Sequence, residues 1–214
     1  MTHVLLTRHG HVEGIDPPRF RGRREIPLSP LGRTQADAVA VRIAASWKIA
    51  AIYTSPLHRC IDTAAAIAEA CGVQASVLDE LADLDYGDWE WKTYEEMDRE
   101  QPELFARWFA TPQLMRFPNG ESLQELVARA AEVLRTALAR HGTEAPIVLV
   151  GHASINRAIL LQVLDQPLSA YWRLEQSPCA LNEFILTPAY SRLDRYNDTS
   201  HLDGIAARPP ADFA

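Results

Sequence analysis

The sequence predicts an α/β fold, a three-layer sandwich in which a mostly parallel central sheet has helices on both faces and carries a small helical cap insertion. Two observations predict this fold. Short apolar runs alternate with stretches whose apolar residues recur at helical spacing, which is the rhythm of β-α-β units. One acidic and aromatic stretch interrupts that rhythm. The chain has 214 residues, 47% hydrophobic and 23% charged, which is enough to bury one full core.

The strands are assigned from apolar runs that stop at turn residues. The first run, residues 3–7, stops at Arg8-His9-Gly10, and the run at residues 146–150 stops at Gly151-His152. Buried parallel strands are expected to look like this, because both of their faces are covered. Further apolar runs complete the predicted sheet, at residues 50–54, 73–77, 180–187 and 192–196.

The helices are assigned from apolar residues that recur every three or four positions. Ser122 has Glu125 three residues later, which is the pattern of a capping box, and a long amphipathic stretch follows it. The predicted helices cover residues 33–46, 62–71, 122–142 and 155–164.

The acidic and aromatic stretch is interpreted as a cap inserted into a single domain. We expect one domain over residues 1–204, a cap insertion at about residues 84–120, and a C-terminal tail at residues 205–214, where Pro209-Pro210 falls.

Charge and cysteine content exclude several classes of partner. With 21 basic and 28 acidic residues the net charge is −7, which argues against nucleic acid and anionic membranes, since both select basic faces. No apolar run is long enough for a membrane helix or a secretory signal, so we expect a cytoplasmic protein. Cys60, Cys71 and Cys179 are predicted to be reduced thiols, two of them in the core. Residues 180–187 form a candidate edge strand through which a homodimer can pair.

Polar groups follow three of the predicted strands. These are Arg8 with His9, then Arg59, then His152, and the carboxyl ends of parallel strands meet at one edge of a sheet. Two arginines and two histidines at one point suit a doubly charged oxyanion, because guanidinium matches phosphate geometry. The residues therefore predict a phosphate site. More arginines, some of which should steer or clamp the anion, gather nearby: Arg19, Arg21, Arg23, Arg24 and Arg33.

Five motifs in order give the chain a resemblance to a known family. They are RHG followed by RGRREIPLSPLG, then TSPLHRCIDTA, then DYGDWEW, then VGH. This series resembles the histidine phosphatase superfamily, in its phosphoglycerate-mutase-like branch, over about residues 3–187. Within that branch, the motifs of this chain most resemble those of small phosphatases such as α-ribazole phosphatase and broad-specificity phosphatases.

The resemblance implies a role for each matching residue. His9 matches the family nucleophile, Arg8 and Arg59 match its phosphate clamp, and His152 matches the second histidine of the pocket. Asp83, four residues before Gly87, falls at the position of the general acid. The resemblance also places substrate contacts at Arg21, Gly22 and Ala153. It implies hydrolysis of a small phosphorylated metabolite through a phosphohistidine, with no cofactor and no metal.

The chain departs from the family pattern at three places. His11-Val12 stand where Glu-Thr is usual, Ile15 stands where a polar contact is expected, and the acid is Asp rather than Glu. His11 and Glu13 are both candidates to replace the missing contact at Ile15.

Alternative functions remain open at this point. One is a phosphoglycerate mutase-type phosphotransferase, and another is a phosphate-binding regulatory protein with weak turnover. A third treats His9-x-His11 as a metal pair, as in amidohydrolase barrels, but such barrels need about 250 residues and further ligands.

Overall fold

A computed structural model gives the fold, and it describes residues 1–142 and 145–205. A six-stranded sheet has the order β3-β2-β4-β1-β5-β6. The first four strands of that order are parallel, and β5 and β6 are antiparallel to their neighbours. The predicted fold class, a mostly parallel sheet between helices, is confirmed. The strands are β1 Thr2–Arg8, β2 Ala51–Thr54, β3 Ala75–Val77, β4 Ile147–Gly151, β5 Leu181–Leu186 and β6 Ser191–Asp198.

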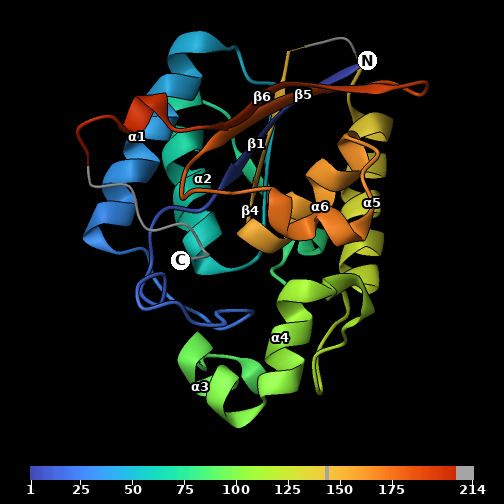
Figure 1. Cartoon of the computed structure of the whole chain (residues 1–214). Helices are drawn as coiled ribbons and strands as arrows, with labels where there is room; N and C mark the ends of the chain where they lie inside the picture. The colour runs from blue at the N-terminus through green and yellow to red at the C-terminus, as the bar shows by residue number, and fades with distance from the viewer. Residues whose placement is uncertain (143–144, 206–214) are drawn as a thin grey trace.

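The helices form two outer layers and a cap. In Figure 1, α1 and α2 lie on one side of the sheet, α5 and α6 on the other, and α3 and α4 beyond one end of it. The α-helices are α1 Pro30–Ser46, α2 His58–Cys71, α3 Tyr94–Glu100, α4 Pro102–Ala110, α5 Leu123–Arg140 and α6 Ala153–Val163. Short 3₁₀ turns are η1 Asp79–Leu81, η2 Gly87–Trp89, η3 Pro112–Leu114, η4 Leu168–Arg173 and η5 Ser200–Leu202.

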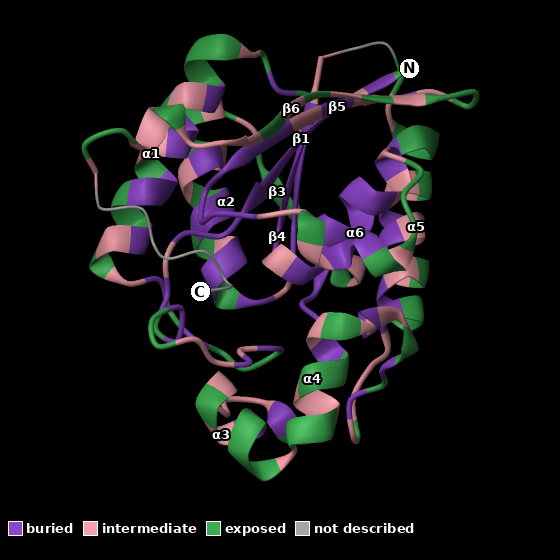
Figure 2. Ribbon diagram, viewed as in Figure 1, coloured by how far each residue is buried: buried purple, intermediate pink, exposed green. Residues whose placement is uncertain are grey.

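Alternate residues of the central strands enter two separate cores. Val4 and Leu6 of β1 pack with α5 and α6, whereas Leu5 packs with α1 and α2. Successive side chains of a strand point to opposite faces, so a strand covered on both faces is apolar throughout. Figure 2 shows this burial at the centre of the sheet, with exposed residues on the outer sides of the helices. The backbone at the ends of β1 and β4 is therefore held rigidly.

The helix starts explain one error of the sequence analysis. The capping box of α5 is present as predicted, with Ser122 and Glu125 each bonded to the other's backbone. Helix α2, however, begins at His58, four residues before the predicted start. Its cap residue Leu57 makes no side-chain capping bond, so no capping residue marked this start in the sequence. Arg59 consequently lies in the first turn of a helix and is fully buried.

The cap region is built around aromatic side chains. Helices α3 and α4 meet at Pro102, where the sequence breaks the helical pattern. Trp89, Trp108 and Phe117 are buried and pack edge to face, with ring centroids 4.9 to 5.3 Å apart. These elements fall within the predicted insertion at residues 84–120, and its status as a cap stays a prediction. Nine of the ten residues in the predicted tail, 206–214, lie outside the described residues.

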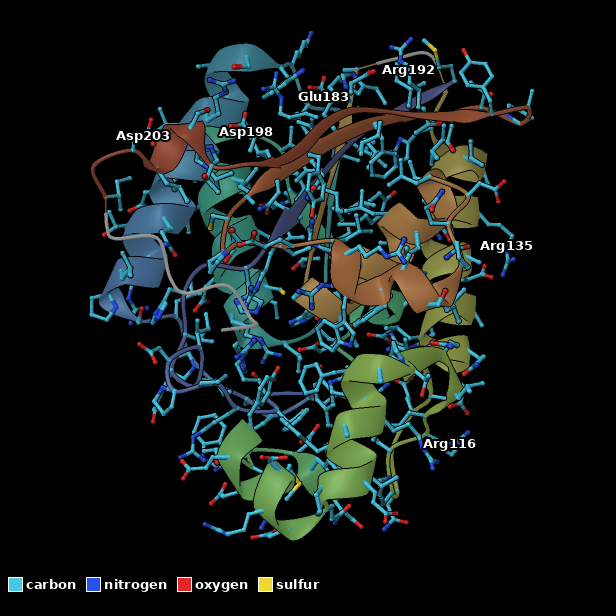
Figure 3. The ribbon with its side chains drawn as sticks, viewed as in Figure 1. Arg116, Arg135, Glu183, Arg192, Asp198 and Asp203 are labelled. Atoms are coloured by element: carbon cyan, nitrogen blue, oxygen red, sulfur yellow. The ribbon has the colours of Figure 1, made fainter. Side chains whose placement is uncertain are left out.

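The sheet edge differs from the prediction. Strand β5, expected at the edge, lies between β1 and β6, so β6 and β3 are the outer strands. Figure 3 labels Glu183, Arg192 and Asp198 along β5 and β6, and Arg195 pairs with both Glu183 and Asp198. Charged side chains on an outer strand discourage pairing with another chain. The candidate dimer edge at residues 180–187 is thus an inner strand, and dimerisation stays a prediction.

Among the described residues, none of the helices has the length and apolar character needed to cross a bilayer.

Candidate active site

A small pocket lies between the sheet and the cap. It takes residues from the ends of β1 and β4, from the loop that precedes α1, and from the cap. Its lining residues are His9, Arg19, Arg21, Asp83, Tyr86, Tyr94, Ala153, Ser154, Arg157 and Trp172. Four of these ten, His9, Arg21, Asp83 and Ala153, are among the predicted site residues. The site lies outside the carboxyl ends of the parallel strands, where open α/β sheets bind ligands.

The geometry around His9 fixes which ring nitrogen is available. His9 directly follows β1, its side chain is 1% exposed, and its backbone N–H donates to the carbonyl of Gly151 at 3.0 Å. The ring Nδ1 lies 2.7 Å from the carbonyl oxygen of Gly10. Because a carbonyl only accepts, Nδ1 carries the proton and Nε2 keeps its lone pair. The His9 ring is therefore presented as a nucleophile through Nε2.

Close backbone packing explains the glycine after His9. A Cβ on Gly10 would overlap the carbonyl of Gly32, at the start of α1. The N–H of Gly10 also donates to the hydroxyl of Thr63 on α2, at 3.1 Å. The turn that holds His9 is thus locked between the first two helices, and a larger residue would push it out of place.

His152 occupies the equivalent position after β4, directly before α6. Its ring centroid lies 5.1 Å from that of His9. The Nε of Arg59 donates to Nδ1 of His152 at 3.2 Å, which makes Nδ1 an acceptor. The proton is then on Nε2, which lies 2.8 Å from the hydroxyl of Ser55. His152 can therefore be neutral and still donate a hydrogen bond.

Burial and neighbouring cations keep both histidines neutral. The pKa of His9 is lowered well below its usual value, first by burial and then by its neighbours, of which Arg59 has the largest effect. The pKa of His152 is lowered in the same direction, first by burial and then by Arg59 and Arg8. A neutral imidazole is the form that attacks phosphorus, so the site is ready near neutral pH.

Arg59 links the two sides of the site. It is 0% exposed, and its Nη1 and Nη2 donate to the carbonyls of Arg24 at 2.8 Å and Gly22 at 2.7 Å. Nη2 also lies 3.2 Å from Oδ2 of Asp83. Arg8, the last residue of β1, is buried too, and its Nη1 donates to the carbonyl of Gln176 at 2.6 Å. Both guanidinium groups are thereby fixed by backbone oxygens before any ligand arrives.

Asp83 enters the pocket from the segment after η1 and is 7% exposed. Its Oδ1 accepts from the hydroxyl of Ser154 and from the backbone N–H of Leu84 at 2.9 Å. Its Oδ2 faces Arg59 and lies 3.5 Å from Nδ1 of His152. One carboxylate therefore lies in direct contact with the cationic and imidazole groups of the site.

The remaining predicted contacts surround this centre. Gly22 has a φ of +50° and supplies a carbonyl to Arg59. Arg21 lines the pocket, and its Nη1 donates to the carbonyl of Gly14. Ala153 is the first residue of α6 and also lines the pocket.

Comparison with known proteins decides the family. A model of the histidine phosphatase superfamily (branch 1) matches residues 4–199, nearly the whole chain. The chain belongs to the histidine phosphatase superfamily. Together with the names of its relatives, this identifies it as a phosphatase.

Individual members of this family are similar to this chain along almost their whole length. "Phosphoserine phosphatase 1" of Hydrogenobacter thermophilus is 29% identical, over 94% of this chain and 95% of that protein. "Probable phosphoglycerate mutase GpmB" of Yersinia enterocolitica is 30% identical, over 95% and 96%. The solved structure of Bacillus stearothermophilus YhfR superposes with a TM-score of 0.88 at 26% identity, over 94% of this chain and 100% of that one.

Two of the three departures from the histidine phosphatase pattern, those at His11-Val12 and Ile15, lie outside the residues that line the pocket, whereas Asp83 lines it. Ile15 is buried in the core beside α1, and Glu13 is exposed. The ring of His11 bonds to Ser29, the residue that caps α1, through Nδ1 at 2.8 Å. Neither His11 nor Glu13 is among the residues that line this pocket, and a role for either in place of Ile15 stays a prediction.

His9 and His11 do not form a metal site with other residues of the described part of the chain. Over residues 1–142 and 145–205, no group of three His, Cys, Asp or Glu side chains is placed to hold a metal ion. His11, the proposed partner of His9, bonds to a serine hydroxyl instead.

Sequence reasoning missed part of the pocket. Ser154 holds Asp83, while Tyr86, Tyr94, Trp172 and Arg157 form the wall next to the cap. Ser154 and Arg157 have a signal that was available, since they follow His152 by two and five residues on one face of α6. The aromatic residues have none, because they come from three separate segments that only the tertiary fold joins.

Proposed function

We propose that this histidine phosphatase is a metal-independent phosphomonoesterase that hydrolyses a small phosphorylated metabolite through a phosphohistidine on His9. The observation that carries this proposal is the bond from Nδ1 of His9 to the carbonyl of Gly10, at 2.7 Å. This bond leaves Nε2 unprotonated, with its lone pair available in a pocket lined by arginines and one carboxylate.

The first step transfers the phosphoryl group to the enzyme. Nε2 of His9 attacks phosphorus while the ester P–O bond breaks, and the leaving oxygen takes a proton from the carboxyl group of Asp83. Arg8 and Arg59 hold the non-bridging oxygens, and His152 supports Arg59 by accepting a hydrogen bond from its Nε. Charge neutralisation by fixed donors stabilises the transition state, and this is the task that metal ions perform in other phosphatases.

The second step returns the enzyme to its starting state. A water molecule attacks the phosphorus of the phosphohistidine, and the carboxylate of Asp83 accepts its proton. The N–P bond breaks, inorganic phosphate leaves, and His9 is neutral again. One group thus acts as acid and then as base, so each turnover ends with Asp83 protonated.

Substrate binding prepares Asp83 for the first step. In the ligand-free site Arg59 is shared between the carboxylate and backbone oxygens. A dianionic phosphate draws the guanidinium group of Arg59 toward itself, because guanidinium binds phosphate oxygens in bidentate fashion. The hydroxyl of Ser154 keeps the Asp83 carboxyl oriented.

We further expect the protein to act in the cytoplasm on free metabolites. All three cysteines are unpaired, and Cys60 and Cys179 are buried as predicted. Reduced thiols and a net charge of −7 suit a reducing compartment and a small-molecule substrate. No nucleic-acid or membrane partner is proposed.

A mutase activity is the second candidate, because one similar protein is named as a probable phosphoglycerate mutase. In that reaction an alcohol takes the place of water as the acceptor of the phosphoryl group from His9. A regulatory protein with weak turnover is the third, and it would bind phosphate without forming product at a useful rate.

Phosphate release in the presence of excess EDTA tests the proposal. We expect sustained hydrolysis of p-nitrophenyl phosphate and of alkyl phosphates, unchanged by the chelator. Activity that disappears with EDTA and returns with Zn²⁺ or Mn²⁺ would contradict metal independence. Interconversion of 2- and 3-phosphoglycerate faster than phosphate release would favour the mutase, and binding without product would favour the regulatory protein.

A further inference from the structure

Arg19 lines the pocket without belonging to the predicted phosphate clamp. It lies in the loop between β1 and α1, and its backbone N–H donates to the carbonyl of Gly14 at 2.9 Å. Its Nη1 donates to the carbonyl of Trp91 at 2.7 Å, and its guanidinium carbon lies 5.0 Å from the centroid of the Trp91 ring. The charged end of Arg19 is therefore held in place at the pocket wall.

Trp91 is itself fixed, so it can act as a platform. Its backbone has a φ of +69°, and its N–H donates to the carbonyl of Phe20 at 2.7 Å. Arg24 lies over the same ring at 4.8 Å. A tryptophan held in the left-handed region by surrounding structure is costly, and such residues gather at functional sites.

Among the described residues Arg19 forms no ion pair, although Glu96 is near enough for the charge of Arg19 to help lower the pKa of that carboxyl. Within the described part of the chain neither Arg19 nor Arg21 forms an ion pair, although acids outnumber basic residues by 28 to 21. Arg23, two residues further on, pairs with Glu121 at 3.0 Å and with Asp85 at 3.7 Å. In this arginine-rich loop, Arg23 is thus paired with carboxylates, whereas Arg19 and Arg21, which line the pocket, are not.

We propose that Arg19 binds a second anionic group, carried by the leaving group of the substrate. This inference rests on the proposed function, in which His9, Arg8 and Arg59 engage the phosphate that is transferred. Arg19 lines the same pocket as Tyr86, Tyr94 and Trp172, and the proposal places the rest of the substrate beside these side chains. The favoured substrates are therefore phosphate esters that carry a carboxylate or a second phosphate.

Matched substrate pairs test this proposal. The first pair is 3-phosphoglycerate and glycerol 3-phosphate, which differ by a carboxylate in place of a hydroxymethyl group. The second is fructose 1,6-bisphosphate and fructose 6-phosphate, which differ by one phosphate. We expect kcat/KM to favour the charged member of at least one pair by about tenfold or more, the scale of a charge-assisted hydrogen bond. The pair that shows the preference identifies the anion.

Substitutions at Arg19 separate recognition from folding. In Arg19→Gln the preference should fall to near unity, while kcat/KM for p-nitrophenyl phosphate, whose leaving group is uncharged before transfer, changes little. Arg19→Lys should keep part of the preference, because it keeps the charge. Arg24→Gln is the matched control, since it removes the same charge from the same Trp91 ring outside the lining residues. It should keep the full preference.

The outcomes distinguish this inference from the proposed function. Equal kcat/KM within both pairs for the wild-type protein, with p-nitrophenyl phosphate still hydrolysed, would overturn the role of Arg19 and leave the phosphatase intact. A preference that survives Arg19→Gln would also overturn it. Failure of the wild-type protein to hydrolyse p-nitrophenyl phosphate at all would instead overturn the proposed function.

Discussion

The two ends of the pocket are built in different ways. The end that faces the phosphate comes from residues at strand ends and helix starts, and His9, His152 and Arg59 there are almost fully buried. The end that faces the leaving group comes from the loop before α1, from the cap and from η4, and its residues are only partly buried: Arg19, Tyr86, Tyr94 and Trp172. The sheet thus fixes the chemistry, and peripheral segments set what the chemistry acts on.

The largest expected effect comes from breaking the phosphate end. His9→Ala should lower phosphate release by about 10⁴-fold or more for every substrate, because the nucleophile is removed. His11→Gln is the matched control, since His11 bonds to Ser29 outside the pocket, and it should retain most activity. Steady-state kinetics and a melting curve are the measurements. More than a tenth of the wild-type rate in His9→Ala would rule out His9 as the nucleophile.

Asp83 lies where the two ends of the pocket meet. Its substitution should affect substrates differently according to their leaving group. Asp83→Asn should slow alkyl phosphates by roughly 10² to 10⁴-fold, because a basic alkoxide needs a proton to leave. The first step with p-nitrophenyl phosphate should be nearly spared, and a burst of p-nitrophenol should precede slow turnover.

The control for this variant is Asp85→Asn, which changes a neighbouring carboxylate that accepts from the N–H of Gly87. Equal losses on alkyl and aryl substrates, with no burst, would mean that Asp83 is not the proton donor.

Arg59 tests whether the phosphate end acts in the transition state. Arg59→Ala should lose about 3 to 4 kcal/mol of transition-state stabilisation, seen mainly in kcat. Arg59→Lys keeps the charge and should recover part of that loss. Because Arg59 is buried and bonded to Gly22 and Arg24, both variants need a thermal melt beside the kinetics. A rise in KM alone would mark Arg59 as a ground-state binder.

The smallest expected effect is on the pH dependence of the free energy of unfolding. It should depend on residues at the phosphate end of the pocket and not on those at the leaving-group end. The pKa values of buried His9 and His152 are lowered in the folded protein. In the unfolded chain a histidine has a pKa of about 6.5, so below that pH the unfolded state binds more protons than the folded state. Stability is then fully present above pH 6.5 and declines as the pH falls below it, by up to about 1.4 kcal/mol per pH unit for each histidine. Urea unfolding at pH 7.5, 6.5 and 5.5 measures this.

His152→Gln should show a shallower decline than the wild-type protein over that range. Arg19→Gln, at the other end of the pocket, should leave the slope unchanged. An unaltered slope in His152→Gln would show that His152 takes up its proton equally in both states.

The phosphate end was predictable from the sequence, and the leaving-group end was not. Apolar runs that stop at Arg8-His9 and Gly151-His152 mark strand ends, and parallel strand ends must meet. The first turn of α2 escaped prediction because Leu57 gives no capping signal.

The cap side of the pocket depends on contacts that no local pattern encodes. Trp91 is half-buried and lies under the guanidinium groups of Arg19 and Arg24. His11, one candidate for the missing contact at Ile15, bonds to Ser29 at the start of α1, a contact that its position in the sequence did not indicate. Side-chain roles in loops follow tertiary neighbours, which spacing along the chain does not reveal.

Trapping the covalent intermediate tests the central claim most directly. Rapid acid-free quenching of the wild-type protein and of Asp83→Asn with ³²P-labelled substrate should give a phosphoenzyme that is labile in acid and stable in alkali. The label should map to the peptide that contains His9, accumulate in Asp83→Asn, and be absent from His9→Ala. A label that is stable in acid, or one that persists in His9→Ala, would contradict the phosphohistidine account.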